Sequence, residues 1–259
     1  MHFAAEPIFH IGFFTFTNSL LYTLFVDALI LLACFFVAKN VRMIPGMLLN
    51  GVEMVIQTFY ELTESVANEK ASRIFPYFMA FFIFILISNW SGLLPGVGSI
   101  GFFEFKEGHK EFIPLLRPTT SDINTTFGLA LISVVATHIM SVRVLGIGEY
   151  LSRYFSLNPI NLFIGLLEII SEITKVISLS FRLFGNIFAG EVVLSTVSSI
   201  FAFIFPLPFM FLEIIVGLVQ ALVFSMLTMA FMAILMTPHH IENKATGPDG
   251  PLVQEEVNH

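Results

Sequence analysis

Charge and cysteine are both scarce in this 259-residue sequence. Only 12% of the residues are charged, against about a quarter in average proteins. The single cysteine, Cys34, excludes an internal disulfide framework. The net charge of −7 lacks the basic excess that nucleic-acid binding requires, so we expect no nucleic-acid partner. Hydrophobic residues make up 56% of the chain, which excludes a disordered protein.

Long apolar runs recur along the chain, and runs of about 18 such residues or more predict membrane-spanning helices. We therefore expect an all-α integral membrane protein that forms a single membrane domain with about five crossings. The crossings are expected at residues 11–38, 74–95, 123–142, 157–205 and 209–236, with a polar tail at 237–259. Residues 96–122 contain Pro, Gly and charges of both signs, which predicts a loop outside the hydrocarbon.

Residues 43–72 follow a different pattern. Apolar side chains recur there at spacings of three and four, while acidic and amide side chains occupy the other side. This pattern predicts an amphipathic helix that lies in the membrane interface or against a partner. A helix packed on a soluble domain is the alternative, but no soluble domain is evident in the sequence.

The apolar stretch at 157–205 is ambiguous in its topology. As one helix it would be about 70 Å long, whereas the hydrocarbon core is about 30 Å thick. The stretch therefore crosses twice or is strongly tilted. A single crossing puts seven basic residues on one side of the membrane and three on the other. This asymmetry favours five crossings, with the N-terminus outside and the C-terminus in the cytoplasm.

Several charged residues lie within the apolar segments, where each costs about 2.5–3.5 kcal/mol on insertion scales. Glu168, Glu172, Lys175 and Arg182 fall within about 80° of one another on one helix. The first three are equally consistent with structural pairing and with function. Arg182 has no nearby acid on its own helix and keeps its proton at any ordinary pH. We therefore expect an acidic partner from another subunit.

Glu191 and Glu213 lie on consecutive helices that Pro206 separates. In an antiparallel pair they would approach one another at a similar depth. A carboxylate in such a place changes its protonation when its environment shifts its pKa, and such groups form proton or cation relays. Together with Gln220 they predict one wet pocket or half-channel.

Motifs for cofactors or catalysis are weak. The run GVGSIG at 96–101 matches a dinucleotide-binding pattern, but a membrane span precedes it and a charged loop follows. The pair His239 and His240 is more typical of a polar flank than of a metal site. We expect no cofactor, no metal and no catalytic residue in this chain.

The run SFRLFGNIFAGE at 180–191 closely resembles the signature of subunit a of rotary F-type ATP synthases. The spacing from Arg182 to Glu213 and Gln220 also matches that family. So do the Asn89 to Pro95 end of the second span and the TSDIN run at 120–124. The resemblance covers nearly the whole chain.

The resemblance implies a stator ion-channel subunit that is not catalytic alone. Two offset half-channels would carry protons, or sodium ions, to and from a rotating c-ring and so couple ion flow to ATP synthesis. The family's essential arginine matches Arg182. Positions lining the outer half-channel match Glu191, Glu213, Asn186 and Gln220, and positions on the cytoplasmic side match Glu168, Lys175 and Ser178.

The resemblance also implies partners and a location. The c-ring would face Arg182, and the peripheral-stalk subunit b would lie near 43–72, in a multisubunit complex within the lipid bilayer. The membrane would be the bacterial inner membrane or, alternatively, the mitochondrial inner membrane. In the family the last two long helices are steeply tilted around the ring, which would account for the length of 157–205.

Two positions depart from the family pattern. Many bacterial members carry Asp where Gly92 stands, and a bacterial histidine position holds Glu213. The partner of Glu191 is therefore open. Two other classes remain: a self-contained secondary transporter, for which no internal repeat is found, and a structural membrane scaffold.

Overall fold

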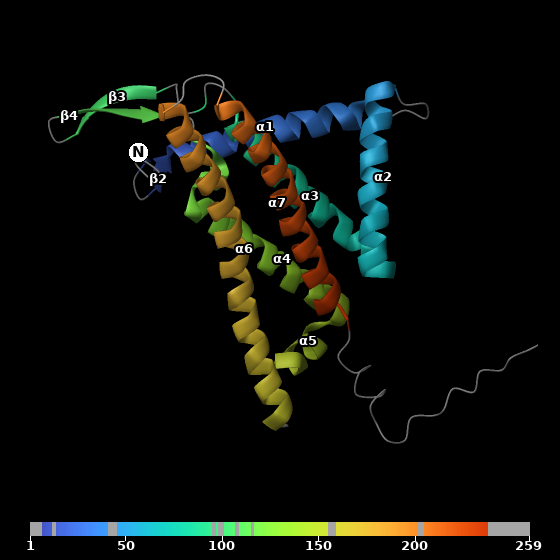
Figure 1. The fold of residues 1–259 in the computed structure, drawn as a ribbon. Helices are drawn as coiled ribbons and strands as arrows, with labels where there is room; N and C mark the ends of the chain where they lie inside the picture. The colour runs from blue at the N-terminus through green and yellow to red at the C-terminus, as the bar shows by residue number, and fades with distance from the viewer. Residues whose placement is uncertain are drawn as a thin grey trace, which may run out of the picture.

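Helices dominate the architecture, with two short hairpins at one end (Figure 1). The computed structural model describes residues 7–11, 14–40, 46–94, 97, 101–106, 109–114, 117–154, 159–200 and 205–237. The GVGSIG run lies largely outside these residues, and the His239–His240 pair lies wholly outside them. The expected all-α membrane fold is confirmed, with the hairpins as additions to it.

Seven α-helices and two short 3₁₀ turns form the described part of the chain. The helices are α1 (Asn18–Lys39), α2 (Met47–Ala67), α3 (Ala71–Gly92), α4 (Ile123–Leu145), α5 (Ile147–Tyr154), α6 (Pro159–Ile200) and α7 (Pro206–Leu235), and the turns are η1 (Asn68–Lys70) and η2 (Thr119–Ser121). Within the described ranges, four helical segments are long and apolar enough to cross a membrane: Asn18–Lys39, Leu49–Gly92, Ile123–Leu145 and Pro206–Leu235.

Both hairpins occupy segments for which the sequence predicted something else. Strands β1 (Pro7–Ile11) and β2 (Phe14–Thr17) pair where the first span was expected to begin. Helix α1 starts only at Asn18, because the Thr17 hydroxyl caps it by accepting from the Leu20 amide at 3.3 Å. Strands β3 (Gly101–Lys106) and β4 (His109–Pro114) pair within the segment that we expected to be a loop.

The amphipathic helix is shorter than expected and continues directly into the next span. Helix α2 ends at Ala67, and Asn68 adopts a positive φ of 48° that breaks the helix. Turn η1 then leads into α3, which begins at Ala71. Residues 43–45 of the expected helix lie outside the described residues.

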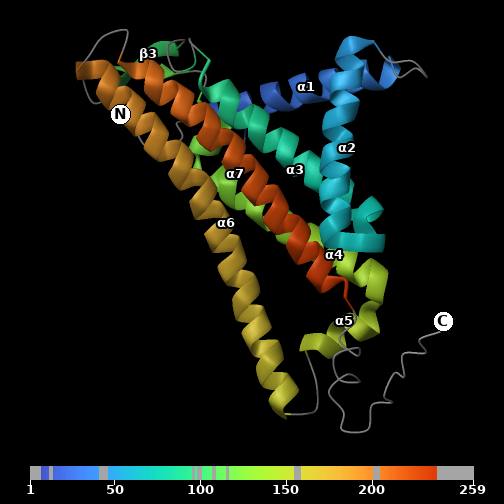
Figure 2. The same ribbon diagram turned by 45° about the vertical axis from the view of Figure 1, so that its right-hand side comes forward.

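Helices α6 and α7 form a long antiparallel pair. Helix α6 is unbroken over 42 residues, about 63 Å at 1.5 Å per residue. The two helices lie side by side at the hairpin end and diverge toward the other end, where α5 lies between them (Figures 1 and 2). Helix α1 runs steeply across the direction of α6 and α7 (Figure 1).

An apolar core fills the middle of the molecule between α3, α4, α6 and α7. Helix α6 contributes Val176, Leu179 and Leu183, which are at most 9% exposed. The other helices contribute Phe81, Phe82, Ile85, Ala130, Val134, Ala221 and Phe224. The inner side of α6 is therefore mostly apolar between its two ends, where the buried Ser180 pairs with Thr126 at 3.3 Å and no charged side chain of the described residues is buried.

Candidate functional site

Arg182 lies on the outer surface of α6, between two groups of polar side chains. Its side chain is exposed, and no described acidic residue forms an ion pair with it. Ser178 and Ala189 are also exposed and lie within about 40° of Arg182 around the helix. For the described residues, the expectation that Arg182 has no acidic partner in its own chain therefore holds, and small side chains surround it.

Asn186 and Gln220 join α6 to α7 one turn beyond Arg182. The Asn186 Nδ2 donates a hydrogen bond to the Gln220 Oε1 at 2.7 Å. Gln220 is 3% exposed, and its Nε2 has no hydrogen-bond partner among the described residues. An unpaired buried donor costs free energy, so this amide is available to an acceptor that enters the site.

Glu213 packs against the backbone of α6 at Gly190. A Cβ added at Gly190 would overlap the Glu213 carboxyl group, so this position accommodates only glycine unless Glu213 moves. Glu213 is 6% exposed, and its Oε1 has no hydrogen-bond partner among the described residues. The antiparallel helices thus bring Glu213 against the residue next to Glu191, at the depth that the sequence predicted.

Glu191 nevertheless has partners of its own from the segment that precedes α4. Its carboxylate interacts with the Ser121 hydroxyl through a hydrogen bond and with the charge of Arg117. Arg117 is 8% exposed, and its Nε donates to the Ser121 Oγ at 3.3 Å. The expected pocket is therefore divided: Glu191, Glu213 and Gln220 lie at the same end of the helix pair with separate contacts.

The C-terminal end of α3 fixes the turn of α7 between Glu213 and Gln220. The Asn89 Nδ2 donates to the Gly217 carbonyl at 3.1 Å, and the Trp90 Nε1 donates to the Ile214 carbonyl at 3.0 Å. A Cβ at Gly217 would lie 3.2 Å from the Asn89 Cβ, so glycine permits this close approach. The contact holds both polar side chains of α7 in register with α6.

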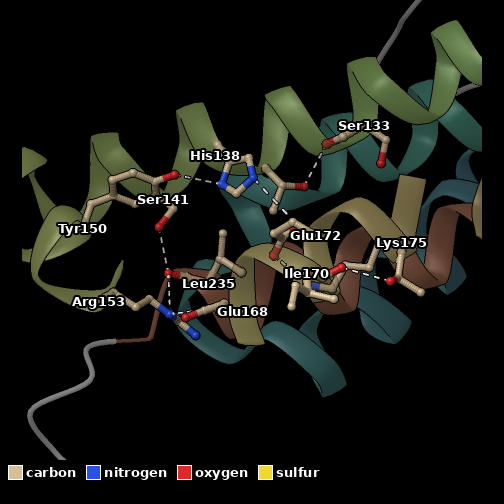
Figure 3. Close-up of polar contacts among 12 residues, drawn as sticks. Ser133, His138, Ser141, Tyr150, Arg153, Glu168, Ile170, Glu172, Lys175 and Leu235 are labelled. Carbon is tan, nitrogen blue, oxygen red and sulfur yellow. Dashed lines mark hydrogen bonds and ion pairs between the residues drawn. The ribbon is translucent and has the colours of Figure 1, made fainter. Parts of the chain in front are cut away.

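A second group of polar side chains joins α4, α5 and α6 at the other end (Figure 3). The His138 Nδ1 lies 3.0 Å from the Tyr150 hydroxyl, and its Nε2 lies 3.7 Å from the Glu172 Oε2. The Lys175 Nζ is 2.7 Å from the Glu172 Oε1 and 4.5 Å from the centre of the Phe231 ring. We call His138, Tyr150, Glu172 and Lys175 the His138 cluster.

Glu168 pairs with a different residue from the one that its spacing suggested. Its Oε1 lies 2.6 Å from the Arg153 Nε of α5, while Glu172 and Lys175 pair with one another three positions apart. Structural pairing on α6 is thus confirmed for Glu172 and Lys175 only. Ser178 is exposed and makes no hydrogen bond to another described residue.

His138, Tyr150 and Arg153 were not predicted from the sequence as site residues. His138 is the one titratable side chain within residues 123–142, and an ionisable residue inside a membrane span is a sign of function. That signal was present in the sequence. The contacts of Tyr150 and Arg153 depend on how α5 folds back onto α6, which the sequence pattern does not give.

Three donors converge on the last carbonyl groups of α7. The Ser141 Oγ donates to the Leu235 carbonyl at 2.8 Å, and the Arg153 Nη1 lies 3.5 Å from the same oxygen. The Lys70 Nζ donates to the Met236 carbonyl at 2.9 Å. Helix C-termini leave such carbonyls unpaired, so these contacts anchor the end of α7 to η1, α4 and α5.

The helices, the exposed arginine and the two polar groups define a multispanning membrane protein of the ion-translocating class. The family model described as "ATP synthase A chain" matches residues 20–233 of the chain. The chain is also 30% identical over 238 residues to the ATP synthase subunit a of Moorella thermoacetica, covering 92% of this chain and 99% of that protein. The chain therefore belongs to the family of ATP synthase subunit a. Members of this family are membrane subunits of a multisubunit complex that carries out ATP synthesis with ion transport.

Proposed function

We propose that the chain is the stator subunit that carries protons to and from a rotating c-ring through two offset half-channels. The observation that carries this proposal is the position of Arg182. It lies exposed on α6, ten residues after Glu172 and nine before Glu191, which is about 15 Å along the helix in each direction. Arg182 therefore stands between two polar ends that do not overlap along the helix.

The apolar core supports an offset path rather than a continuous one. Leu179 is 2% exposed and Leu183 is 0% exposed, and both lie on the inner side of α6 between the two ends. A charged species cannot cross such a region without a large desolvation cost. An ion that enters at one end must therefore pass along the exposed face with the help of a partner. This arrangement disfavours a self-contained transporter, because such a protein would need a continuous route through its own interior.

The exposed face around Arg182 fits a partner that carries an acid. A guanidinium in a membrane needs a carboxylate or water nearby, and the small side chains of Ser178 and Ala189 let a partner helix approach closely. In this mechanism the carboxylate of each passing c subunit is attracted to Arg182 and releases its proton. The permanent charge of Arg182 also keeps a proton from passing directly between the two half-channels.

The residues near each end would line the two half-channels. Glu191, Glu213, Asn186 and Gln220 form the outer end, and Glu168, Lys175 and Ser178 belong to the cytoplasmic end. The buried Glu213 oxygen without a partner and the free Gln220 amide support a wet outer path, since both can bind water. In this proposal the contacts of Glu191 with Arg117 and Ser121 position it at the opening of the outer half-channel.

The remaining parts of the proposal concern orientation and partners. With α1 upright in the membrane, its steep angle to α6 and α7 makes those two helices strongly tilted (Figure 1). Helix α2 presents exposed apolar and acidic side chains, among them Met54 at 67% exposure, and we assign it to the interface and to subunit b. The bacterial relative supports the bacterial inner membrane as the location.

The test is Arg182→Ala in the complete ATP synthase, with ATP synthesis and ATP-driven proton pumping measured in inverted membranes. We expect both activities to be abolished while the complex still assembles. Arg143→Ala is the matched control, because Arg143 is also an exposed arginine without a described partner, at the end of α4. Normal ATP synthesis by the Arg182→Ala enzyme refutes the proposal, and sodium-dependent pumping refutes the proton as the ion.

A further inference from the structure

The His138 cluster contains a connected set of groups that can exchange protons. His138 comes from α4, Tyr150 from α5 and Glu172 from α6, and the His138 ring lies between the other two side chains (Figure 3). Each of its two ring nitrogens faces a different partner. An imidazole in this position can accept a proton at one nitrogen while it releases a proton from the other.

The distances fit a relay. The 3.0 Å separation of the His138 Nδ1 and the Tyr150 oxygen is that of a hydrogen bond. The 3.7 Å separation of the His138 Nε2 and the Glu172 Oε2 exceeds a hydrogen bond, so a small rotation or one bridging water closes that step. The side chains of His138 and Glu172 are 25% and 12% exposed, which leaves His138 the more accessible of the two.

The charged side chains in and beside the His138 cluster balance one another. Two acids, Glu168 and Glu172, stand against two bases, Arg153 and Lys175, so the surroundings are neutral when His138 is neutral. A proton on His138 is attracted by Glu172 at 3.7 Å and opposed by Lys175.

We propose that His138 is a proton-relay residue that passes protons between Glu172 and the cytoplasm by way of the Tyr150 hydroxyl. The inference rests on the proposed function and gives the cytoplasmic half-channel a specific exit. A proton that reaches the Glu172 carboxylate moves to the His138 Nε2. The proton on Nδ1 then passes to the Tyr150 oxygen, whose own proton leaves to water, and the reverse sequence operates during ATP-driven pumping.

His138→Gln in the complete enzyme is the principal test, because an amide keeps a donor and an acceptor near Tyr150 and Glu172 but does not titrate. We expect ATP synthesis per assembled complex to fall by about 10²-fold or more, the lower end of what one positioned proton-transfer group contributes. The dependence of the rate on cytoplasmic pH between about 5 and 8 should also become flat. Ile132→Gln, which puts the same amide on an exposed position of α4, should leave both rate and pH profile unchanged.

Other titratable groups face His138 or lie near it. Glu168, Glu172 and Lys175 face it from α6, and Tyr150 faces it from α5. Burial, together with the neighbouring Tyr150, raises the pKa of Tyr154, so that phenol stays protonated throughout the range. Tyr154 therefore does not contribute to a pH dependence between about 5 and 8.

Tyr150→Phe provides a second variant that keeps the ring next to His138, 6.0 Å between centroids. We expect it to slow synthesis but to keep the pH profile, since His138 still titrates. A wild-type rate and profile in His138→Gln overturns the inference, as does a lower amount of complex with an unchanged profile per complex. If Arg182→Ala abolishes synthesis while His138→Gln is normal, only the relay fails. Normal synthesis in Arg182→Ala removes the proposed function itself.

Discussion

Gly165 lies where α5 touches α6, and its replacement by alanine tests the packing that holds α5 against α6. A Cβ at Gly165 would overlap the carbonyl oxygen of Tyr154 and lie 3.0 Å from the Tyr154 Cα. Both atoms belong to the backbone, so no side-chain rotation relieves the contact. The end of α5 must move, and it carries the neighbouring Arg153 away from Glu168.

The expected magnitude follows from two opposing effects. Overpacking of this kind costs about 1–3 kcal/mol, whereas Gly→Ala inside a helix gains about 0.5–1 kcal/mol. Gly128→Ala in α4 is the matched control, because no atom lies within 4 Å of its added Cβ. We expect the control to be slightly stabilised and Gly165→Ala to lie about 1–3 kcal/mol below it.

The assay is the thermal midpoint for retention of the subunit in the detergent-solubilised complex, followed on native gels. At about 2–4 °C per kcal/mol, the two variants should differ by roughly 2–12 °C. A midpoint for Gly165→Ala equal to or above that of Gly128→Ala would refute the close approach of α5 and α6. It would also remove the geometric basis for the Arg153–Glu168 pair.

Three further substitutions test other contacts. Gly92→Asp puts a Cβ 2.9 Å from the Pro118 ring; we expect about 1–3 kcal/mol of destabilisation, seen as less subunit in membranes on immunoblots, and unchanged levels would contradict it. Asn89→Ala leaves the buried contact to the Gly217 carbonyl unmade; we expect a loss of about 1–3 kcal/mol in the same thermal assay, and an unshifted midpoint would count against this contact. Gly185→Leu meets no described atom within 4 Å of its Cβ; we expect stable subunit but at least ~10-fold slower ATP synthesis, because the proposed c-ring would face that surface, and a normal rate would argue against that placement.

The spans that could be predicted are those with long uninterrupted apolar runs. Two spans illustrate this, since residues 123–142 and 209–236 were expected and α4 and α7 cover Ile123–Leu145 and Pro206–Leu235. Length and hydropathy suffice there because the bilayer sets the length of a spanning helix. The hairpins were missed because a two-stranded ribbon has short segments and few tertiary contacts, so its sequence signal is weak.

The candidate site was predictable only where one helix sets the geometry. The position of Arg182 relative to Lys175 and Asn186 follows from the 100° rotation per residue, and the structure has all three on one unbroken helix. The contact of Glu191 with Ser121 and Arg117 joins segments that are distant in sequence, and no periodicity indicates it. Tertiary packing selects such partners, and a hydrophobic pattern along the chain does not predict which distant side chains it brings together.

Glycine residues determine how the geometry of each single helix leads to contacts between helices. Gly190 admits the Glu213 carboxyl group, and Gly217 admits Asn89, so small residues determine how closely the polar helices approach. In a membrane the hydrophobic effect does not favour helix association, because lipid tails are as apolar as the side chains. Close packing of the helix backbones stabilises the association instead. The glycines at these contacts therefore determine where the polar side chains of α7 lie. A replacement of Gly190 or Gly217 should consequently alter the proposed outer half-channel, even though neither glycine can bind an ion through a side chain.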